Sequence, residues 1–283
     1  KQILQEDGIP VFADLARCIR ALSLVAQRNR LTGPTSGAGA AVAQPLAAAG
    51  NSAVAQLLRS HTYLTEYEGK QWLKQFGLDV PVGKWAHSEQ EVLQVARELQ
   101  FPVALKISDR NVLHKSEVGG VQLNIQNEQA LLQAYRKMAA NEKIRRGTQP
   151  LQVLVEEMAT KPIVAELIAS LRVDPVFGPV IVVGTGGIFT ELLQDYVVLK
   201  PPLARDEIAE ALKRLKGYRL LTGYRNLPPA DVGAVIRAIH TLEQIGRLWG
   251  DVLTEIEINP LAVFAEGEKV MALDVIVKGR GGD

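Results

Sequence analysis

The amino-acid sequence predicts an α+β fold, within the broader α/β class, whose sheets are mixed and largely antiparallel. First, strand-sized apolar runs often follow one another without an intervening helix, which argues against a strict alternation of helices with parallel strands. Second, helical segments with capping residues separate groups of these runs. Third, 47% of the 283 residues are hydrophobic, so the chain can bury a core in one or two domains.

The charge balance and the cysteine content narrow the class of protein. The 32 basic and 31 acidic residues give a net charge of +1, so we expect no nucleic acid and no membrane surface as a partner. Cys18 is the one cysteine, which excludes a disulfide framework and fits a reducing cytoplasm. No apolar run reaches the roughly 20 residues that a membrane-spanning helix needs.

The composition divides the chain into three parts. Residues 1–31 predict one extended piece and one helix, too little for a domain, and we interpret them as the C-terminal tail of a preceding α/β domain. Residues 32–55 are predicted to be a flexible linker, because residues 32–50 carry no charge and are almost wholly small residues and proline. Residues 56–283 are then one folded domain.

Capping residues and apolar spacing predict the elements of that domain. Thr65 with Glu68 and Ser88 with Glu91 form two capping boxes, and each opens a helix. The elements expected after them are strands at 103–107 and 121–125, a helix at 128–140, strands at 151–156, 163–173 and 179–183, helices at 206–215 and 231–249, and strands at 255–258 and 270–275.

The first candidate site is Lys106 with the loop that follows it. Lys106 lies near the end of an apolar strand, so its ammonium group must reach an anion or water. The loop carries His114 and Lys115, and it ends in Gly119-Gly120, whose backbone amides could approach phosphate oxygens closely. An ordinary strand-end lysine and an exposed hairpin loop explain the same residues, so both interpretations stay open here.

A second candidate is the end of the next strand. Glu156, Glu157 and Met158 could offer backbone groups to an adenine edge and a carboxylate to a lysine or a ribose. Glu166, on the strand after it, is similarly ambiguous. Acidic residues at the surface end of a strand are the alternative, and the residues alone favour it.

A glycine-rich turn around Gly186 and Gly187 is a third candidate. A strand that runs into such a turn could bind an anion, especially where a helix begins. A tight turn that needs glycine at positive φ is an equally good explanation.

The last candidate is a set of oxygen ligands near the C-terminus. Alternation along 255–259 puts Glu257 and Asn259 on one face of a strand, and Asp274 follows on the next expected strand. Hard oxygen ligands on neighbouring strands suit Mg²⁺ that is held jointly with a polyphosphate. A solvated sheet face is the alternative.

Several motifs, taken together and in order, resemble the ATP-grasp subunit or domain of ADP-forming acetyl-CoA and acyl-CoA synthetases, which are relatives of succinyl-CoA synthetase. The resemblance covers about residues 60–278. It is carried by the motifs LHKSEVGGV (113–121), DPVFGP (174–179), GTGGIFTELLQD (184–195), LLTGYR (220–225) and EIEINPL (255–261).

The resemblance implies an ATP-grasp fold of two lobes and a role for each candidate residue. Lys106 would hold the phosphates of ATP, residues 156–158 would lie along the adenine and ribose, and a magnesium ion would be bound at Glu257, Asn259 and Asp274. His114 would be the catalytic phosphate relay, which forms a phosphohistidine and exchanges the phosphoryl group with ADP. Imidazole suits this step because its unperturbed pKa is about 6.5.

The same resemblance implies a ligase that makes or consumes acyl-CoA in the cytoplasm. Its cofactors would be ATP or ADP and Mg²⁺, with Lys115, Gly119, Gly120, Glu166, Gly186 and Gly187 also contacting the nucleotide. Its partner would be a CoA-ligase domain or subunit that binds CoA and the carboxylic acid elsewhere, and residues 1–31 would be the end of such a domain. This chain would then catalyse the nucleotide half-reaction.

Two other functions fit the same architecture. One is the synthetase-like regulatory portion of a protein lysine acetyltransferase, which the intact His114 and EIEINPL motif disfavour. The other is a different ATP-grasp carboxylate ligase, which joins an acid to an amine and would not need His114. A scaffold without chemistry is a further possibility, and Mg-ATP binding would separate it from both.

Overall fold

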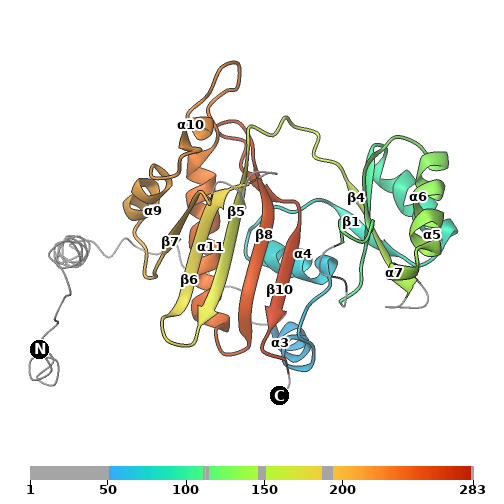
Figure 1. Cartoon of the computed structure of the whole chain (residues 1–283), viewed down its shortest axis with the longest axis horizontal. Helices are drawn as coiled ribbons and strands as arrows, with labels where there is room; N and C mark the ends of the chain where they lie inside the picture. Colours follow the sequence, from blue (N-terminus) through green and yellow to red (C-terminus); the bar gives the residue numbers. More distant parts are fainter. Residues whose placement is uncertain (1–50, 111, 113–114, 146–150, 187–193, 282–283) are drawn as a thin grey trace, which may run out of the picture. The chain divides into compact units, whose positions relative to one another are not determined.

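The computed structural model describes residues 51–110, 112, 115–145, 151–186 and 194–281 (Figure 1). The contacts of the chain separate it into two units, Lys1–Pro45 and Leu46–Asp283. The first unit lies outside the described residues, and so do the expected domain tail at 1–31 and most of the expected linker at 32–55. Within the described part, no helix combines the length and the apolar composition needed to cross a bilayer.

The end of the expected linker is helical, which corrects that boundary. Helix α3 spans Asn51–Ser60, so residues 51–55 belong to the folded domain. Val54, Leu57 and Leu58 recur at helical spacing, and Leu58 is completely buried in the core. The small residues that precede this helix have the same composition as its first turn, and this hid its start in the sequence.

A four-stranded antiparallel sheet forms the first half of the domain. Its strand order is β1 (Gly83–Ala86), β4 (Val153–Glu157), β2 (Val103–Ile107), β3 (Val121–Ile125). Helices α5 (Glu89–Leu99) and α6 (Glu128–Ala140) cover one face, and the short helix α7 (Glu142–Arg145) follows them (Figure 1). Val103, Leu105 and Ile107 of β2 point into the core between this sheet and its helices.

A second, six-stranded sheet forms the other half. Its strands run in the order β10 (Val275–Gly279), β8 (Leu253–Val263), β5 (Ala165–Asp174), β6 (Gly178–Thr185), β7 (Tyr196–Leu199), with β9 (Val270–Ala272) paired to β8. The long helix α11 (Val232–Trp249) packs behind β5 and β6, next to α9 (Arg205–Leu212), and α10 (Tyr218–Leu221) lies between these two helices in the sequence (Figure 1). All pairs of named strands in the described residues are antiparallel, whereas the sequence predicted mixed sheets that are largely antiparallel.

Strand β5 shows how the six-stranded sheet separates its two faces. Ala165, Leu167, Ala169 and Leu171 are buried in the core that includes α11. The alternate residues of β5 lie on the other face, where Glu166 and Arg172 are exposed. Because β8 pairs with β5 in register, Glu255 and Glu257 lie on this open face as well.

Helix α4 (Glu66–Gln75) begins with the predicted capping box. The Thr65 hydroxyl accepts a hydrogen bond from the backbone N–H of Glu68, and the Glu68 carboxylate accepts one from the backbone N–H of Thr65 at 2.8 Å. Trp72 on its buried side packs edge-on against Trp249 of α11, with ring centroids 5.1 Å apart. The cap and this aromatic contact fix the first turn of α4, which carries part of the site described below.

Two local predictions need correction, and two strands were missed. The second capping box is half formed, because the Glu91 carboxylate accepts from the backbone N–H of His87 rather than from Ser88. Strands β1 and β7 were not predicted, since each has four residues and neither sequence, GKWA or YVVL, alternates apolar with polar residues. The strand expected at 270–275 is two strands, and Asp274 lies in the bend between them.

We predict that Leu58→Ala lowers the free energy of unfolding by about 2–5 kcal/mol, because it leaves a cavity where α3 packs on the core. The measurement is a urea unfolding curve of the whole chain. Gln56→Ala, on the exposed side of the same helix, is the matched control and should change the curve little. Equal curves for the two variants would mean that α3 is not part of the folded domain.

Candidate functional site

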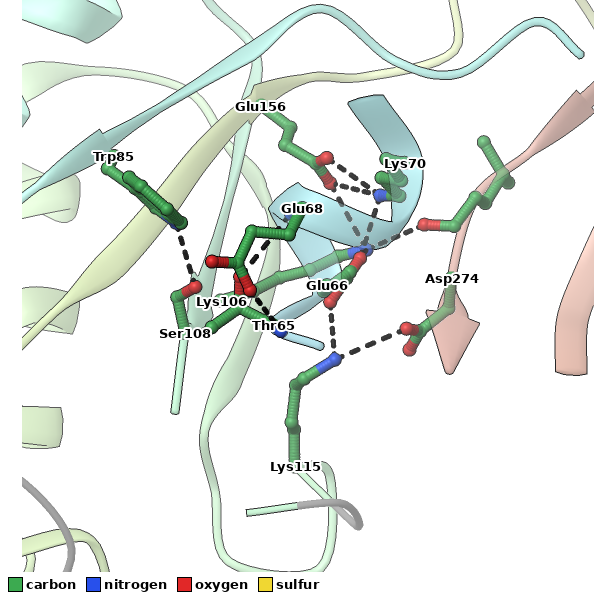
Figure 2. Close-up of polar contacts among 11 residues, drawn as sticks. Thr65, Glu66, Glu68, Lys70, Trp85, Lys106, Ser108, Lys115, Glu156 and Asp274 are labelled. Carbon is green, nitrogen blue, oxygen red and sulfur yellow. Dashed lines mark hydrogen bonds and ion pairs between the residues drawn. The ribbon is translucent and has the colours of Figure 1, made fainter. Parts of the chain in front are cut away.

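Three lysines and three carboxylates meet beside the first turn of α4 (Figure 2). They come from five places in the chain, namely α4, β2, the loop after β2, β4 and the bend before β10. The cluster, which we call the lysine–carboxylate cluster, consists of Glu66, Lys70, Lys106, Lys115, Glu156 and Asp274. Formally it carries three positive and three negative charges.

Glu66 is the centre of this cluster. Its Oε1 accepts a hydrogen bond from Lys106 Nζ at 2.6 Å and lies 2.7 Å from Lys70 Nζ, and its Oε2 accepts from Lys115 Nζ at 2.5 Å. The side chain of Glu66 has no exposed surface. One carboxylate therefore holds ammonium groups from a helix, a strand and a loop.

Glu156 and Leu273 complete the surroundings of the lysines. Both carboxylate oxygens of Glu156 accept from Lys70 Nζ, at 2.7 and 2.8 Å, and one of them is 3.2 Å from Lys106 Nζ. Lys106 Nζ also donates to the backbone carbonyl of Leu273 at 2.7 Å. Each ammonium group thus has more than one acceptor, which is what allows a charge to be buried.

Burial and the close charges shift the pKa values of Glu66 and of the three lysines. Burial acts to raise the pKa of Glu66, but the ammonium groups of Lys106, Lys70 and Lys115 outweigh it and hold the pKa well below its usual range. Burial acts to lower the pKa of Lys106 and Lys115, but the carboxylates around them raise it above the usual lysine value. Burial and the neighbouring Lys106 charge lower the pKa of Lys70.

The local structure explains why these side chains converge. On β2 the odd-numbered residues fill the core under α5 and α6, so Lys106 points to the opposite face. Ala104 pairs with Glu156 and Lys106 pairs with Leu154, which puts Glu156 on the same face as Lys106, as a diagonal neighbour. Glu66 and Lys70 share one side of α4 because they are four residues apart.

The loop after β2 delivers Lys115 to the cluster, but His114 lies outside the described residues. Backbone hydrogen bonds close the end of this loop: Gly120 N–H donates to Lys115 O, and Ile107 N–H donates to Gly120 O, each at 2.7 Å. Gly119 has φ 69°, and a Cβ at Gly120 would come within 2.6 Å of the Ile107 side chain. Both glycines are thus required by the loop itself.

The last residue of β4, Glu157, and the residue after it, Met158, follow Glu156 in the chain without joining the cluster. The Glu157 carboxylate accepts from the backbone N–H of Val82 at 3.0 Å, which links the end of β4 to the start of β1. Met158 follows β4 and is half-buried. These two residues and Glu156 therefore form one continuous edge, of which Glu156 alone is in the cluster.

Glu166 and Gly186 lie together on the other sheet. Gly186 N–H donates to the Glu166 carbonyl at 2.7 Å, and a Cβ at Gly186 would come within 2.8 Å of that oxygen. The close backbone approach explains the glycine at this position, whereas the Glu166 side chain is exposed. Gly187 lies outside the described residues.

The predicted oxygen ligands adjoin the cluster through Asp274. Asn259 N–H donates to the Asp274 carbonyl at 3.1 Å, and Asn259 Nδ2 is 3.5 Å from Glu257 Oε1. The Asp274 carboxylate also lies 3.3 Å from Lys115 Nζ. Two carboxylates and an amide on a partly open surface fit Mg²⁺, which keeps several water or phosphate ligands of its own. In the described ranges, no group of three or more His, Cys, Asp or Glu gathers in a way that could hold a metal.

Sequence reasoning assigned no role to Glu66 and Lys70, and it quoted Asp195 only as the last residue of the motif 184–195. The first two were read only as part of an expected helix, although their four-residue spacing was visible. Asp195 is buried and accepts hydrogen bonds from the backbone N–H groups of Lys216 and Gly217 and from the Thr185 hydroxyl, at 2.7, 2.8 and 3.1 Å. It joins the end of β6 to the segment before α10.

The described residues thus form two antiparallel sheets, with a buried lysine on one and carboxylate and amide side chains on the open face of the other. Residues 56–278 match the family model described as ATP-grasp domain. The chain therefore belongs to the ATP-grasp family.

Curated relatives place it more closely within that family. The chain is 34% identical over 226 residues to the beta subunit of acetate–CoA ligase [ADP-forming] II of Pyrococcus furiosus, a match that covers 79% of this chain and 95% of the subunit. It is 30% identical over 283 residues to acetate–CoA ligase [ADP-forming] I of Archaeoglobus fulgidus, a match that covers 98% of this chain and 40% of that protein. The chain thus spans nearly a whole subunit of one relative and less than half of the other.

Solved structures agree with the sequence relatives. Acetyl-coenzyme A synthetase 1 of Ca. Korarchaeum cryptofilum, in complex with coenzyme A, Ca-AMPCP and HgCl⁺, is 33% identical with a TM-score of 0.71, over 77% of this chain and 94% of that chain. The same enzyme with coenzyme A and Mg-AMPPCP, its phosphohistidine segment pointing towards the nucleotide-binding site, is 32% identical with a TM-score of 0.65, over 77% and 93%. The ATP-grasp fold expected from the sequence is confirmed.

We predict that Glu66→Gln lowers the free energy of unfolding by about 3–5 kcal/mol at pH 7, because it leaves buried ammonium groups without their carboxylate. The pKa of Glu66 is lower in the folded state, so as pH falls the unfolded chain takes up the proton first. The stabilisation is therefore complete well above the unfolded pKa of about 4.3 and is lost as pH falls below it toward the folded pKa.

Urea unfolding of the wild type and the variant between pH 7 and pH 3 checks this prediction. The difference in free energy of unfolding between the wild type and Glu66→Gln should be constant at neutral pH and should become smaller in acid. Glu128→Gln removes a carboxylate from an exposed ion pair with Arg97 and is the control. A difference in free energy of unfolding that grows toward low pH would contradict the lowered pKa assigned to Glu66.

Proposed function

We propose that this chain is the nucleotide-binding, phosphotransfer part of an ADP-forming acyl-CoA synthetase. The overall reaction would be acyl-CoA + ADP + phosphate ⇌ carboxylic acid + CoA + ATP. The observation that carries the proposal is that Lys115 lies 3.3 Å from Asp274 and Lys106 donates to the backbone carbonyl of Leu273 beside it, in a chain similar to the beta subunits of such ligases. Two cations and a set of hard oxygen ligands at one place are what a metal–polyphosphate requires.

Each predicted residue then has a task. Lys106 and Lys115 contact the phosphate oxygens, and Gly119 and Gly120 line the loop end beside them. Residues 156–158 lie along the adenine and ribose, Glu166 and Gly186 approach the nucleotide from the second sheet, and Gly187 is a further nucleotide contact. Glu257, Asn259 and Asp274 hold Mg²⁺, which when bound supplies positive charge to the phosphates.

The phosphoryl group passes through His114. In the direction of ATP synthesis, a terminal oxygen of ADP attacks phosphorus, a P–O bond forms, the N–P bond of the phosphohistidine breaks, and the imidazole nitrogen keeps the electron pair. The two lysines offset the negative charge that spreads over the transferred group. At 4 Å and an effective dielectric of 20, one such charge contact is worth about 4 kcal/mol.

The partner is a CoA-ligase domain or subunit in the same cytoplasmic enzyme. This domain or subunit binds CoA and the carboxylic acid, because the site residues predicted in this chain are all assigned to the nucleotide, the metal or the phosphate relay. The Korarchaeum complex supports this arrangement, because there a phosphohistidine segment points towards the nucleotide-binding site in the presence of coenzyme A. The nucleotide half-reaction belongs to this chain.

We expect γ-labelled ATP with Mg²⁺ to give an acid-labile, alkali-stable phosphoprotein that His114→Ala abolishes. Imidazole forms this N–P bond, whereas a phosphoserine would survive acid. His87→Ala, at an exposed histidine paired with Glu91, is the control and should keep the label. Loss of label in both variants, or label in His114→Ala, would contradict the assigned relay.

The metal assignment has its own test. We expect Glu257→Gln to weaken Mg-ATP binding about tenfold or more and to leave binding of metal-free ATP nearly unchanged, because the variant removes a metal ligand and no phosphate contact. Isothermal calorimetry with and without Mg²⁺ measures both constants. Glu210→Gln, at an exposed residue paired with Lys213, is the control. Equal weakening with and without metal would reject Glu257 as a ligand.

A further inference from the structure

We propose that Glu66 is a positioning residue that holds the two phosphate-binding lysines, Lys106 and Lys115, at one fixed separation. This inference rests on the proposed function, because it concerns the lysines assigned there to the nucleotide. Glu66 itself contacts no phosphate in this scheme. It acts through the two ammonium groups.

The two carboxylate oxygens of Glu66 bind different lysines. Glu66 Oε1 binds Lys106 at 2.6 Å, and Oε2 binds Lys115 at 2.5 Å, so the two lysines lie on the two arms of one carboxylate (Figure 2). Lys106 comes from a strand and Lys115 from a loop, and their like charges repel. A carboxylate between them both removes the repulsion and sets the distance.

Glu66 is itself held rigidly, as a positioning residue must be. It is the first residue of α4, between Thr65 and Glu68 of the capping box, and a carboxylate is favoured there by the helix dipole. Trp72 anchors the same helix against Trp249. The side chain has no exposed surface, so its carboxylate cannot swing into water.

Helix stability alone does not account for the arrangement. Lys70 lies four residues along the same helix and already pairs with Glu66 at 2.7 Å. The other two lysines come from β2 and from the loop after it, at separations of 40 and 49 residues. Buried ion clusters cost desolvation and are weak evidence for stability. Binding of a polyphosphate by Lys106 and Lys115 explains why these two additional lysines are present.

The positioning role predicts that Glu66→Gln affects nucleotide binding and phosphoryl transfer differently. Glu66→Gln removes the anion that competes with phosphate for Lys106 and Lys115, so nucleotide binding should stay within about threefold of the wild type or tighten. It also frees the lysines from their fixed positions, so transfer should slow by about 10- to 100-fold. A merely structural role would weaken binding and transfer together.

The experiment uses the full chain together with its CoA-ligase part. Calorimetry gives the dissociation constant of Mg-ADP, and rapid quench gives the single-turnover rate of phosphoryl transfer. Glu66→Asp keeps the charge but shortens the reach by one methylene, so it should transfer at an intermediate rate. Glu128→Gln is the control and should match the wild type in both measurements.

A double-mutant cycle with Lys115→Met separates an effect on the position of Lys115 from a nonspecific loss of structure. If Glu66 acts through Lys115, Glu66→Gln should slow transfer far less in the Lys115→Met background than in the wild type. Circular dichroism confirms folding of each variant, and Glu66→Asp carries the test if Glu66→Gln does not fold. Fully additive effects, or parallel losses of binding and transfer in Glu66→Asp, would overturn the proposal.

Failure of the proposed function would look different. If the wild-type protein transfers no phosphate, the proposed function is rejected. Amide hydrogen exchange of residues 115–121 still tests whether Glu66 holds Lys115 in place. Glu66→Gln should speed exchange at Gly119 and Gly120, because Lys115 loses its partner and Gly120 N–H bonds to Lys115 O. Unchanged exchange in that stretch would overturn Glu66 as the anchor of Lys115.

Discussion

The contact between one buried carboxylate and three ammonium groups is the constraint on which the site depends. Glu66 ties α4 to β2 and to the loop after it, and Lys115 extends the same network to Asp274 next to β10. Every charge in the network is satisfied only while these elements of both sheets keep their places. The cost of burying five of these six charges is offset by their mutual pairing, and removal of one buried group leaves its partners with an unbalanced charge.

The local structure was largely predictable from the sequence because it follows short-range rules. Alternation and helical spacing gave β2, β3 and α6 with their observed bounds, and the Thr65 capping box marks the start of α4. The short strands β1 and β7 were missed because four residues carry almost no periodicity. Their place is set by pairing with β4 and β6, which no local rule describes.

The candidate site was only partly predictable, for a similar reason. The alternation in 255–259 correctly puts Glu257 and Asn259 on the less buried face, but nothing local shows that Asn259 meets Asp274 in a bend. Glu66 and Lys70 have the spacing of a pair on an exposed helix surface. Their burial depends on Lys106 and Glu156, 40 and 86 residues away, and such distant pairing cannot be deduced from spacing.

The balance of charge also suggests how a nucleotide could enter this site under the proposed function. Lys115 and Asp274 form a long contact, 3.3 Å, and the Asp274 side chain is 35% exposed whereas that of Glu66 is fully buried. The cluster is therefore easiest to open at this pair. A metal–nucleotide arriving there could give its cation to Asp274 and its phosphate to Lys115, so that each group exchanges one partner for another of the same sign. No charge is left unpaired by that exchange, and the Glu66 end of the cluster can stay intact while the Asp274 end takes the ligand.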